Sequence, residues 1–349
     1  MIKVIVVDDS AFMRKAIREI LESDPDIKVI DTARNGADLL EKLEKEEPDV
    51  ITLDINMPVM DGKETLEVMK KKGINIPVIV ISSLTKEDAP ITLELLDLGA
   101  VDYVPKPSGT ISLDIKKVSD EIIEKVKNAY KTKGKVKTLF KKLPRKRLFE
   151  HKVEKKQVAK YVVAIGISTG GPATLIDILQ EVNEPEDDTA YLVVQHMPPQ
   201  FTPSLAKRLT EYSPIQFYHA SPGQAILGGY GYLAPGGWHL TLTKEYKVRL
   251  FKDDKYIYYP SVDVLFNTVA DMFSPNAIGV LLTGIGKDGA EGLLKMKQNG
   301  CYTIAESEET AIVYGMPRAA KEIGAAIKIL PSYKIAREIN QVLKRMRRG

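Results

Sequence analysis

Cysteine is almost missing from this sequence of 349 residues, in which Cys301 is the only one. A single thiol excludes both a disulfide framework and a zinc site built on cysteines. Because Cys301 follows a glycine and precedes a short apolar run, we expect it in the core. An apolar run of membrane-spanning length and an N-terminal secretory signal are also lacking. These absences predict a cytoplasmic protein without membrane insertion.

A large net charge is lacking as well. The chain has 50 Lys and Arg against 47 Asp and Glu, a net charge of +3, which gives no general attraction to nucleic acid. The basic excess is local, at residues 131–160 and 344–348, where nucleic acid or an acidic partner could bind. The alternative is a solvated linker and a frayed helix end, which the absence of apolar periodicity favours. We therefore predict a basic linker at 131–159 and no nucleic-acid partner.

The length predicts two domains, which we place at residues 1–130 and 160–349. In the first, five apolar strands alternate with amphipathic helical patterns. Units of this size predict an α/β fold with a doubly wound parallel sheet, whose ligands lie beyond the carboxyl ends of the strands. The predicted strands are residues 3–7, 28–33, 50–53, 78–81 and 102–105.

Polar residues gather at these strand ends. Asp8 and Asp9 follow the first strand, Asp54 ends the third, Ser82 the fourth and Lys106 the fifth. Three converging carboxylates repel one another, and their hard oxygen ligands suit Mg²⁺. Asp54 could then accept a phosphoryl group, with the metal and Lys106 neutralising its oxygens and Ser82 donating a hydrogen bond. Alternatively, each residue is a helix cap or surface ion pair, but their matching positions favour a site.

Four segments of this domain carry a family signature: Val-Val-Asp-Asp-Ser at 6–10, Leu-Asp-Ile-Asn-Met-Pro-Val-Met-Asp-Gly at 53–62, Ile-Ser-Ser at 81–83 and Lys-Pro at 106–107. With them the domain resembles a response-regulator receiver, which implies a flavodoxin-like fold. The resemblance implies Asp54 as phospho-acceptor and metal ligand, and Asp8 and Asp9 as further metal-binding acids. It also implies the backbone carbonyl of Asn56 as a metal ligand and Lys106 as the cation that contacts the phosphate.

Two more positions match the receiver family. Ser82 stands where its members carry Thr or Ser, and Tyr103 matches the aromatic residue that reports the switch. The resemblance implies two packings of the fourth strand and the helix after it, biased by one phosphoryl charge. It also implies a chemotaxis histidine kinase as the phosphoryl donor.

The second domain begins with a strand, a turn and a helix. The apolar strand is followed by Gly-Ile-Ser-Thr-Gly at 166–170, with Ser168 at its centre. In such a G-x-S-x-G elbow the glycines allow a tight reversal, and the serine is left exposed beside a helix N-terminus, as a nucleophile requires. Two alternatives stay open at this point: the turn could cradle a dinucleotide phosphate, or the serine could be only an N-cap.

Partners for Ser168 are few, because the chain has four histidines. His196 and Asp288 each follow a predicted apolar strand, as Ser168 does, so all three should share one rim of a parallel sheet. His196 would then act as the base and Asp288 would orient its ring, while N–H groups at 284–286 hold the oxyanion. Gln195 stands where a dinucleotide ribose would need an acid, which disfavours that alternative. The other histidines are His151, His219 and His239.

The rest of the second domain is predicted to continue the α/β pattern, with one stretch of short strands outside the main sheet. We expect the short segments at 215–219, 231–234, 240–242 and 247–251 to form a β excursion from a mostly parallel main sheet. The other predicted elements are strands at 190–194, 277–282 and 301–305 and helices at 202–210, 262–273, 290–297 and 335–346.

Six segments of this domain carry a second signature: Gly-Ile-Ser-Thr-Gly-Gly-Pro at 166–172, Gln-His-Met-Pro at 195–198, Ala-Pro-Gly-Gly at 234–237, Pro-Ser-Val-Asp at 260–263, Leu-Thr-Gly-Ile-Gly-Lys-Asp-Gly at 282–289 and Tyr-Gly-Met-Pro at 314–317. With them the domain resembles the catalytic domain of the chemotaxis protein-glutamate methylesterases, the CheB family. The resemblance implies Ser168 as nucleophile, His196 as base and Asp288 as its orienter. Ile285, where many members have Met, is implied to supply the oxyanion N–H, and Thr169 to contact the site.

The resemblance also implies the reaction. The substrate is the γ-methyl ester of glutamates on the cytoplasmic helices of chemoreceptors, and members also deamidate selected glutamines. Residues 260–263 and 315–317 are expected to wall the site, and the esterase step needs no cofactor, whereas receiver phosphorylation needs Mg²⁺. We predict a phosphorylation-activated serine esterase that serves adaptation in chemotaxis. The alternative is a receiver-controlled module that binds nucleotides or nucleic acid through the basic linker.

Overall fold

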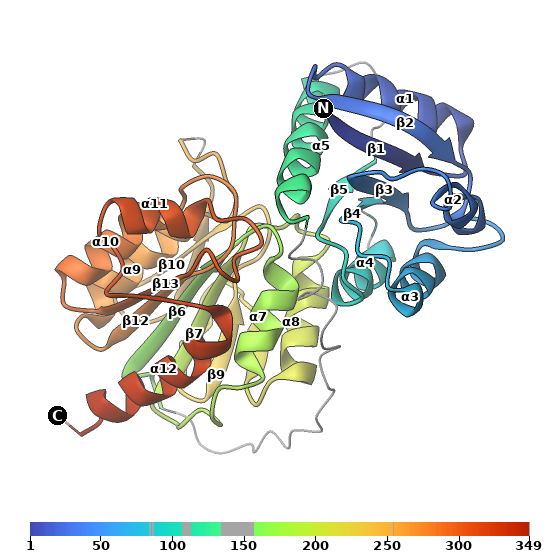
Figure 1. Cartoon of the computed structure of the whole chain (residues 1–349). Coiled ribbons are helices and arrows are strands. Elements are labelled where there is room, and N and C mark those ends of the chain that lie inside the picture. Colours follow the sequence, from blue (N-terminus) through green and yellow to red (C-terminus); the bar gives the residue numbers. More distant parts are fainter. Residues whose placement is uncertain (84, 86, 107–112, 134–156, 254, 349) are drawn as a thin grey trace. The chain divides into compact units, whose positions relative to one another are not determined.

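The computed structural model describes residues 1–83, 85, 87–106, 113–133, 157–253 and 255–348, without the side chains of 113–117 (Figure 1). The chain divides into two compact units, Met1–Leu143 and Pro144–Gly349. Most of the predicted linker lies outside the described residues. In the part of the chain that is described, no helix combines the length and the apolar character needed to span a bilayer.

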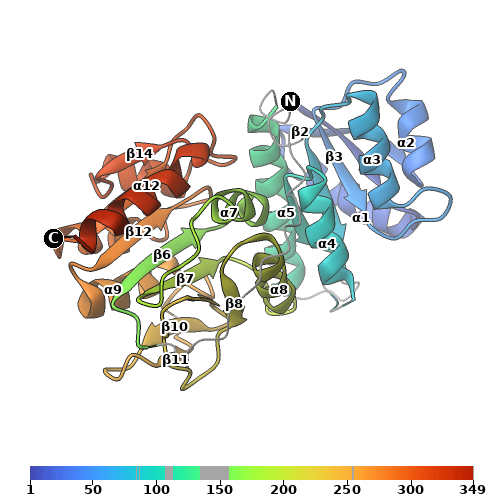
Figure 2. The same cartoon turned by 90° about the horizontal axis from the view of Figure 1, so that it is seen from below.

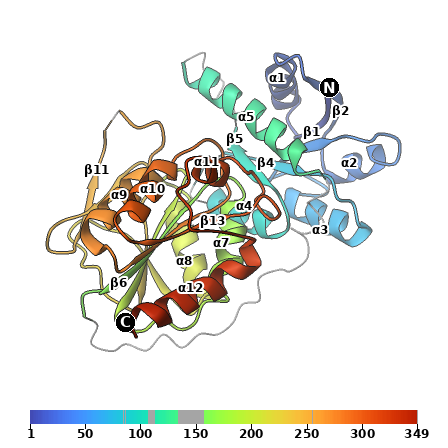
Figure 3. The same cartoon turned by 60° about the vertical axis from the view of Figure 1, so that its left-hand side comes forward.

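The first unit is a five-stranded, wholly parallel sheet in the order β2-β1-β3-β4-β5. Its central strands β3 and β4 are buried along their whole length, which explains why their sequences are apolar runs. Helices α1 and α5 lie together on one face, and α2, α3 and α4 form a row on the other (Figure 3). The predicted doubly wound fold is confirmed. Its elements are β1 (Ile2–Val7), α1 (Ala11–Glu22), β2 (Ile27–Ala33), α2 (Gly36–Lys42), β3 (Val50–Asp54), α3 (Gly62–Lys72), β4 (Val78–Ser82), α4 (Asp88–Asp97), β5 (Asp102–Pro105) and α5 (Leu113–Lys131).

The second unit is a seven-stranded parallel sheet in the order β14-β13-β12-β6-β7-β9-β8, with a separate antiparallel pair, β10-β11. Helices α7, α8 and α12 cover one face (Figure 2). Helices α9 and α10 pack together on the other face (Figure 1), and α9 contacts β10. Its elements are β6 (Tyr161–Ile167), α7 (Gly171–Leu179), β7 (Thr189–Gln195), α8 (Thr202–Tyr212), β8 (Gln216–His219), β9 (Tyr230–Leu233), β10 (His239–Leu242), β11 (Val248–Phe251), α9 (Val262–Phe273), β12 (Ala277–Leu281), α10 (Ala290–Gln298), β13 (Tyr302–Glu306), α11 (Met316–Glu322), β14 (Lys328–Leu330) and α12 (Ser332–Met346).

The β excursion is smaller than the sequence predicted. β8 and β9 belong to the main sheet, because β9 pairs in parallel with β7 and β8 pairs in parallel with β9. Only β10 and β11 leave it, as an antiparallel hairpin against α9. The four segments look alike in sequence because each is short and all lie in a stretch rich in glycine and proline. What distinguishes them is their pairing partner, which the sequence does not display.

Candidate active site and phosphoryl-acceptor site

Backbone hydrogen bonds bring the ends of three neighbouring strands together. In the sheet, β6 lies between β12 and β7. The Ser168 N–H donates to the Thr283 carbonyl (2.9 Å), and the His196 N–H donates to the Ile167 carbonyl (3.0 Å). Asp288 stands in the loop between β12 and α10. The three residues that were expected to share a rim thus all follow the carboxyl ends of adjacent parallel strands.

The turn after β6 is a sharp elbow. Gly170 has φ 73°, and a Cβ there would lie 2.3 Å from Ile312 Cδ1, so both the conformation and the space require glycine. The Ser168 carbonyl accepts the Gly171 N–H (2.8 Å) and the Gln195 side-chain amide (2.9 Å). Ser168 is 9% exposed, so the site is shielded from bulk water without being sealed.

The Asp288 carboxylate is the centre of a hydrogen-bond network. Its Oδ2 lies 2.8 Å from His196 Nε2 and accepts the Val262 N–H (2.7 Å). Its Oδ1 accepts the Ser261 hydroxyl (2.8 Å) and the Asp263 N–H (3.1 Å). Burial works to raise the pKa of Asp288, but His196 and the backbone N–H groups outweigh it and lower that pKa to about 2. The carboxylate is therefore ionised at neutral pH and holds the imidazole in place.

The second ring nitrogen of His196 is left available for chemistry. Nδ1 is buried and hydrogen-bonds to no residue that the structure describes. Because Nε2 faces Asp288, the neutral ring carries its proton on Nε2 and its lone pair on Nδ1. A buried lone pair on the same rim as the Ser168 hydroxyl is what a general base for that hydroxyl requires.

The loop after β12 packs directly on the serine. A Cβ added to Gly284 would lie 2.7 Å from the Ser168 Cβ. The Gly284 N–H donates to the Val313 carbonyl (3.0 Å), and the Met316 N–H donates to the Gly284 carbonyl (2.9 Å). Within the described residues, the N–H of Ile285 donates to no partner. The Gly284 N–H is therefore already used in a hydrogen bond, whereas the Ile285 N–H can still donate one to an oxyanion.

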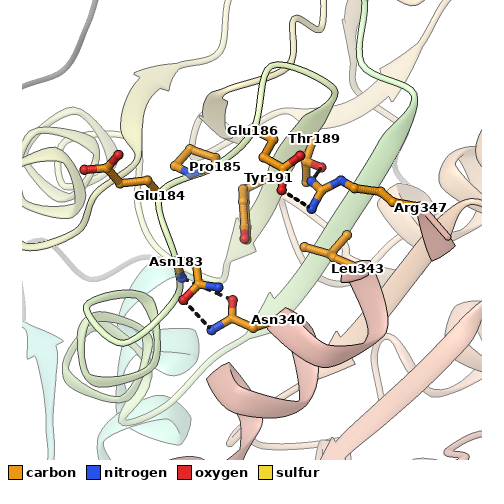
Figure 4. A pocket seen from close by; sticks show the side chains of 9 residues that line it. All are labelled: Asn183, Glu184, Pro185, Glu186, Thr189, Tyr191, Asn340, Leu343 and Arg347. Atoms are coloured by element: carbon orange, nitrogen blue, oxygen red, sulfur yellow. Dashed lines mark hydrogen bonds and ion pairs between the residues drawn. The ribbon is translucent and has the colours of Figure 1, made fainter. Parts of the chain in front are cut away.

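A small cleft lies at the opposite end of β7 from His196, between the start of that strand and the end of α12 (Figure 4). Its volume of about 30 Å³ is room for a single water molecule. Arg347 fills one side and pairs with Glu186 (2.8 Å) and Asp188 (2.9 Å). Because the Arg347 charge is paired within the chain, we interpret this cleft as part of the structural contact between α12 and the sheet.

Three carboxylates meet at the carboxyl ends of β1 and β3. Oxygens of Asp8, Asp9 and Asp54 lie within 4.8 Å of one another. Lys106 Nζ lies 2.8 Å from Asp54 Oδ2 and 3.2 Å from Asp8 Oδ2, yet the buried Asp8 Oδ2 accepts no hydrogen bond in the described part. Burial raises the pKa of Asp54; Lys106 opposes this and the Asp8 charge adds to it. Clustered oxygen ligands and excess negative charge fit a Mg²⁺ site.

The remaining predicted receiver residues contact α4 or the core. The Asn56 side chain donates to Asp88 Oδ1 (3.2 Å), which leaves its backbone carbonyl for the expected metal contact. The buried Ser82 hydroxyl lies 3.1 Å from that of Thr92, so it connects β4 to α4. Tyr103 is buried, with 5% of its surface exposed. Ser82 thus joins the strand and the helix that the receiver resemblance describes as the switch.

Comparison with known proteins matches two parts of the chain to two family models. The model of the CheB methylesterase matches residues 163–339, and that of the response regulator receiver domain matches residues 4–116. A protein-glutamate methylesterase/protein-glutamine glutaminase of Carboxydothermus hydrogenoformans is 45% identical over 357 residues, covering 98% of this chain and 99% of its own. One from Caldanaerobacter subterraneus is 46% identical, covering 96% of this chain and 95% of its own. The chain belongs to the CheB methylesterase family.

A solved structure supports the second unit in particular. The CheB methylesterase catalytic domain of Thermotoga maritima is 39% identical, covers 53% of this chain and 100% of its own, and has a TM-score of 0.50. The CheB methylesterase match spans Ser168, His196 and Asp288, and the receiver match spans Asp54 and Lys106. The two matches leave residues 117–162 uncovered, and the predicted linker lies within this range.

Sequence reasoning missed the residues that contact the candidate catalytic groups. Ser261 was expected only as part of a wall, yet its hydroxyl binds Asp288. His239 was set aside, but it is fully buried and its Nδ1 accepts the Ser261 N–H (3.1 Å). Tyr258 was not considered, although its ring stacks on His196. All three contacts depend on how the segment before α9 folds back, which no local pattern reveals.

Asp263 makes the stability of this domain depend on pH. Burial raises its pKa to about 6, opposed by the Gly292 N–H and assisted by repulsion from Asp288. A raised pKa means that the folded domain binds more protons than the unfolded one. Its stabilising contribution is therefore complete below about pH 4 and lost as pH rises through about 6, whereas Asp288, with its lowered pKa, titrates below this range.

We expect Asp263→Asn to flatten the dependence of the unfolding midpoint on pH between about 4 and 7, because asparagine does not titrate there. Trp238 is the single tryptophan and lies in the second unit, so its fluorescence follows the unfolding of that unit in the full-length chain. If the unfolding midpoints of the variant and the parent protein depended on pH in the same way, the raised pKa of Asp263 would be contradicted.

Proposed function

We propose that the chain acts in the cytoplasm, hydrolyses γ-methyl esters of glutamate side chains on the helices of chemoreceptors, and deamidates selected glutamines there. Ser168 is the nucleophile, His196 the general base and Asp288 the group that orients it. The observation that carries this proposal is the His196 imidazole, which Asp288 holds through Nε2, while its buried Nδ1 makes no hydrogen bond to a described residue on the rim where Ser168 stands. The type of reaction and its substrate are inferred from membership of the CheB methylesterase family.

In the first half of the reaction, Ser168 Oγ attacks the ester carbonyl as His196 Nδ1 takes the hydroxyl proton. The negative charge that develops on the carbonyl oxygen is bound by the Ile285 N–H, with Thr169 as a supporting contact next to the nucleophile. His196 then gives the proton to the departing methoxide, which leaves as methanol. The product of this half is an acyl ester between the receptor glutamate and Ser168.

In the second half, water attacks the acyl ester while His196 accepts one of its protons, and that proton returns to Ser168 as the glutamate carboxylate leaves. With a glutamine substrate the steps are the same, except that ammonia departs in place of methanol. Asp288 stays ionised throughout because its pKa is about 2, and it stabilises the imidazolium that forms twice in each cycle. None of these steps needs a cofactor.

Phosphorylation of the receiver controls this activity in our proposal. Asp54 accepts a phosphoryl group from a chemotaxis histidine kinase, and Asp8, Asp9 and Asp54, with the backbone carbonyl of Asn56, would hold Mg²⁺. The ion supplies charge neutralisation at the phosphoryl oxygens. Lys106, 2.8 Å from Asp54, supplies a second positive charge. The proposal includes an increase of esterase activity upon phosphorylation.

The binding-module alternative finds no support at the elbow. Where a dinucleotide-binding domain would need an acidic residue, the side chain of Gln195 donates to the carbonyls of Ser168 (2.9 Å) and His196 (3.1 Å). This amide therefore braces the turn itself. The esterase proposal is tested by incubating the full-length chain with methylated receptor in membranes and measuring methanol. Release above the level without enzyme supports the proposal, and no release at any enzyme concentration contradicts it.

We expect Asp54→Asn to abolish phosphorylation by a small donor such as acetyl phosphate in the presence of Mg²⁺, since the acceptor oxygen is lost. Removing Mg²⁺ with EDTA should have the same effect on the parent protein. Asp31→Asn is the matched control, because Asp31 pairs with Lys42 away from the acidic cluster. Undiminished phosphorylation of the Asp54 variant would place the acceptor elsewhere. Equal methanol release with and without donor would refute control by phosphorylation.

A further inference from the structure

One aromatic ring lies flat on the imidazole of the proposed base. The ring centroids of Tyr258 and His196 are 4.4 Å apart, and the two planes differ by 5°. Tyr258 comes from the segment between β11 and α9, whose last residue, Ser261, donates its hydroxyl to Asp288. A single segment therefore touches both members of the hydrogen-bonded pair, His196 through a ring face and Asp288 through a hydrogen bond.

Two hydrogen bonds fix the backbone that follows Tyr258. The Tyr259 carbonyl accepts the Gly237 N–H (3.1 Å), and the Ser261 N–H donates to the buried His239 Nδ1 (3.1 Å). These bonds restrict where the Tyr258 ring can go, so the stacking geometry is built into the fold. A ring held in this way can in turn restrain the ring on which it stacks.

The far end of the same side chain reaches the loop with the open N–H group. A Cβ added to Gly286 would lie 3.0 Å from the Tyr258 hydroxyl, and Gly286 has φ 78°, so the hydroxyl closely approaches this backbone. Gly286 is the neighbour of Ile285, whose N–H we assign to the oxyanion. Tyr258 thus spans the distance from the base to the oxyanion loop.

We propose that Tyr258 is a positioning residue of the esterase reaction, which holds the His196 ring in plane for proton transfer and stabilises it when it becomes a cation. The inference rests on the proposed function of Ser168 and His196. The electron-rich face of an aromatic ring attracts a cation, and more strongly where water is excluded. His196 is 9% exposed at its side chain, so the stack acts on a poorly hydrated imidazolium. Because His196 takes up a proton in the step that forms the acyl ester, the effect falls on kcat.

The test compares two substitutions in the full-length chain. Tyr258→Phe keeps the stacked ring and loses the hydroxyl, whereas Tyr258→Leu keeps apolar bulk and loses the ring. With methylated receptor as substrate, we expect the Leu variant to lower kcat by about tenfold with KM changed less than about twofold. The Phe variant should keep kcat within about twofold of the parent value. Tyr333→Leu, an exposed tyrosine on α12, should behave as the parent protein.

Equal kcat values for the Leu and Phe variants would overturn the inference, as would a change confined to KM. Unfolding midpoints from Trp238 fluorescence show whether the Leu variant is folded, and an unfolded Leu variant is replaced by Tyr258→Met, for which the same loss is expected. Failure of the proposed function gives a different result, since methanol release by the parent protein would then be absent or would persist in Ser168→Ala. The two failures are therefore distinguishable.

Discussion

Ser168→Ala is expected to lower methanol release from methylated receptor by about 10⁴-fold or more, because it removes the atom that forms the acyl ester. The fold should survive. The side chain of Ser168 is small, and the turn is held by backbone: the Ser168 N–H donates to Thr283, and its carbonyl accepts Gly171 and Gln195. These bonds do not involve the hydroxyl. The loss should therefore appear in kcat, with receptor binding unchanged.

Ser221→Ala is the matched control, since Ser221 is an exposed serine of the same unit that follows β8, the edge strand separated from β7 by β9. It should release methanol at the parent rate. Ammonia release from receptor glutamines should fall in Ser168→Ala by a similar factor, because each leaving group departs from a tetrahedral intermediate that is bonded to Ser168 Oγ. A Ser168 variant that keeps more than about a hundredth of the activity would remove Ser168 from the role of nucleophile.

The second large effect is expected at Asp288. Asp288→Asn should lower kcat by about 10⁴-fold, because an amide cannot stabilise the imidazolium and favours the wrong tautomer of His196. The structure adds a further reason. Oδ1 and Oδ2 together accept Ser261, Val262 and Asp263, so the NH₂ group of an asparagine would face at least one donor.

The control for Asp288→Asn is Asp271→Asn, at an exposed carboxylate on α9 that pairs with Lys295 (2.7 Å). This change should leave the rate unaltered. The activity of the parent protein should show no acidic loss attributable to Asp288 above about pH 4, because its pKa is about 2. A loss of less than about tenfold in Asp288→Asn would mean that the carboxylate only supports the loop.

The position of Ser168, His196 and Asp288 on one rim could be predicted from the sequence for a simple geometric reason. Ser168, His196 and Asp288 each follow an apolar run, and the carboxyl ends of parallel strands share one rim whatever the strand order is. The same reasoning brought Asp8, Asp54 and Lys106 together in the first unit, where the strand order is that of a flavodoxin-like sheet. Residues at the carboxyl ends of parallel strands can therefore be assigned to one rim even when the strand order is unknown.

The sequence could not predict contacts between segments that share no hydrophobic periodicity. The short strands β8 and β9 join the main sheet while β10 and β11 do not, although all four look alike. α11 and β14 escaped notice because they are only 7 and 3 residues long. Tyr258 and His239 meet the active site through the fold of one irregular segment. Such contacts are set by packing and hydrogen bonding in three dimensions, so only the structure reveals them.

The central claim, that Ser168, His196 and Asp288 act as one unit, is tested most directly by a double-mutant cycle of methanol release with Ser168→Ala, Asp288→Asn and the two combined. If Asp288 acts only through His196 on Ser168, the combined variant should be no slower than Ser168→Ala alone. Rate losses that multiply in the combined variant would contradict the account, since the two groups would then contribute independently.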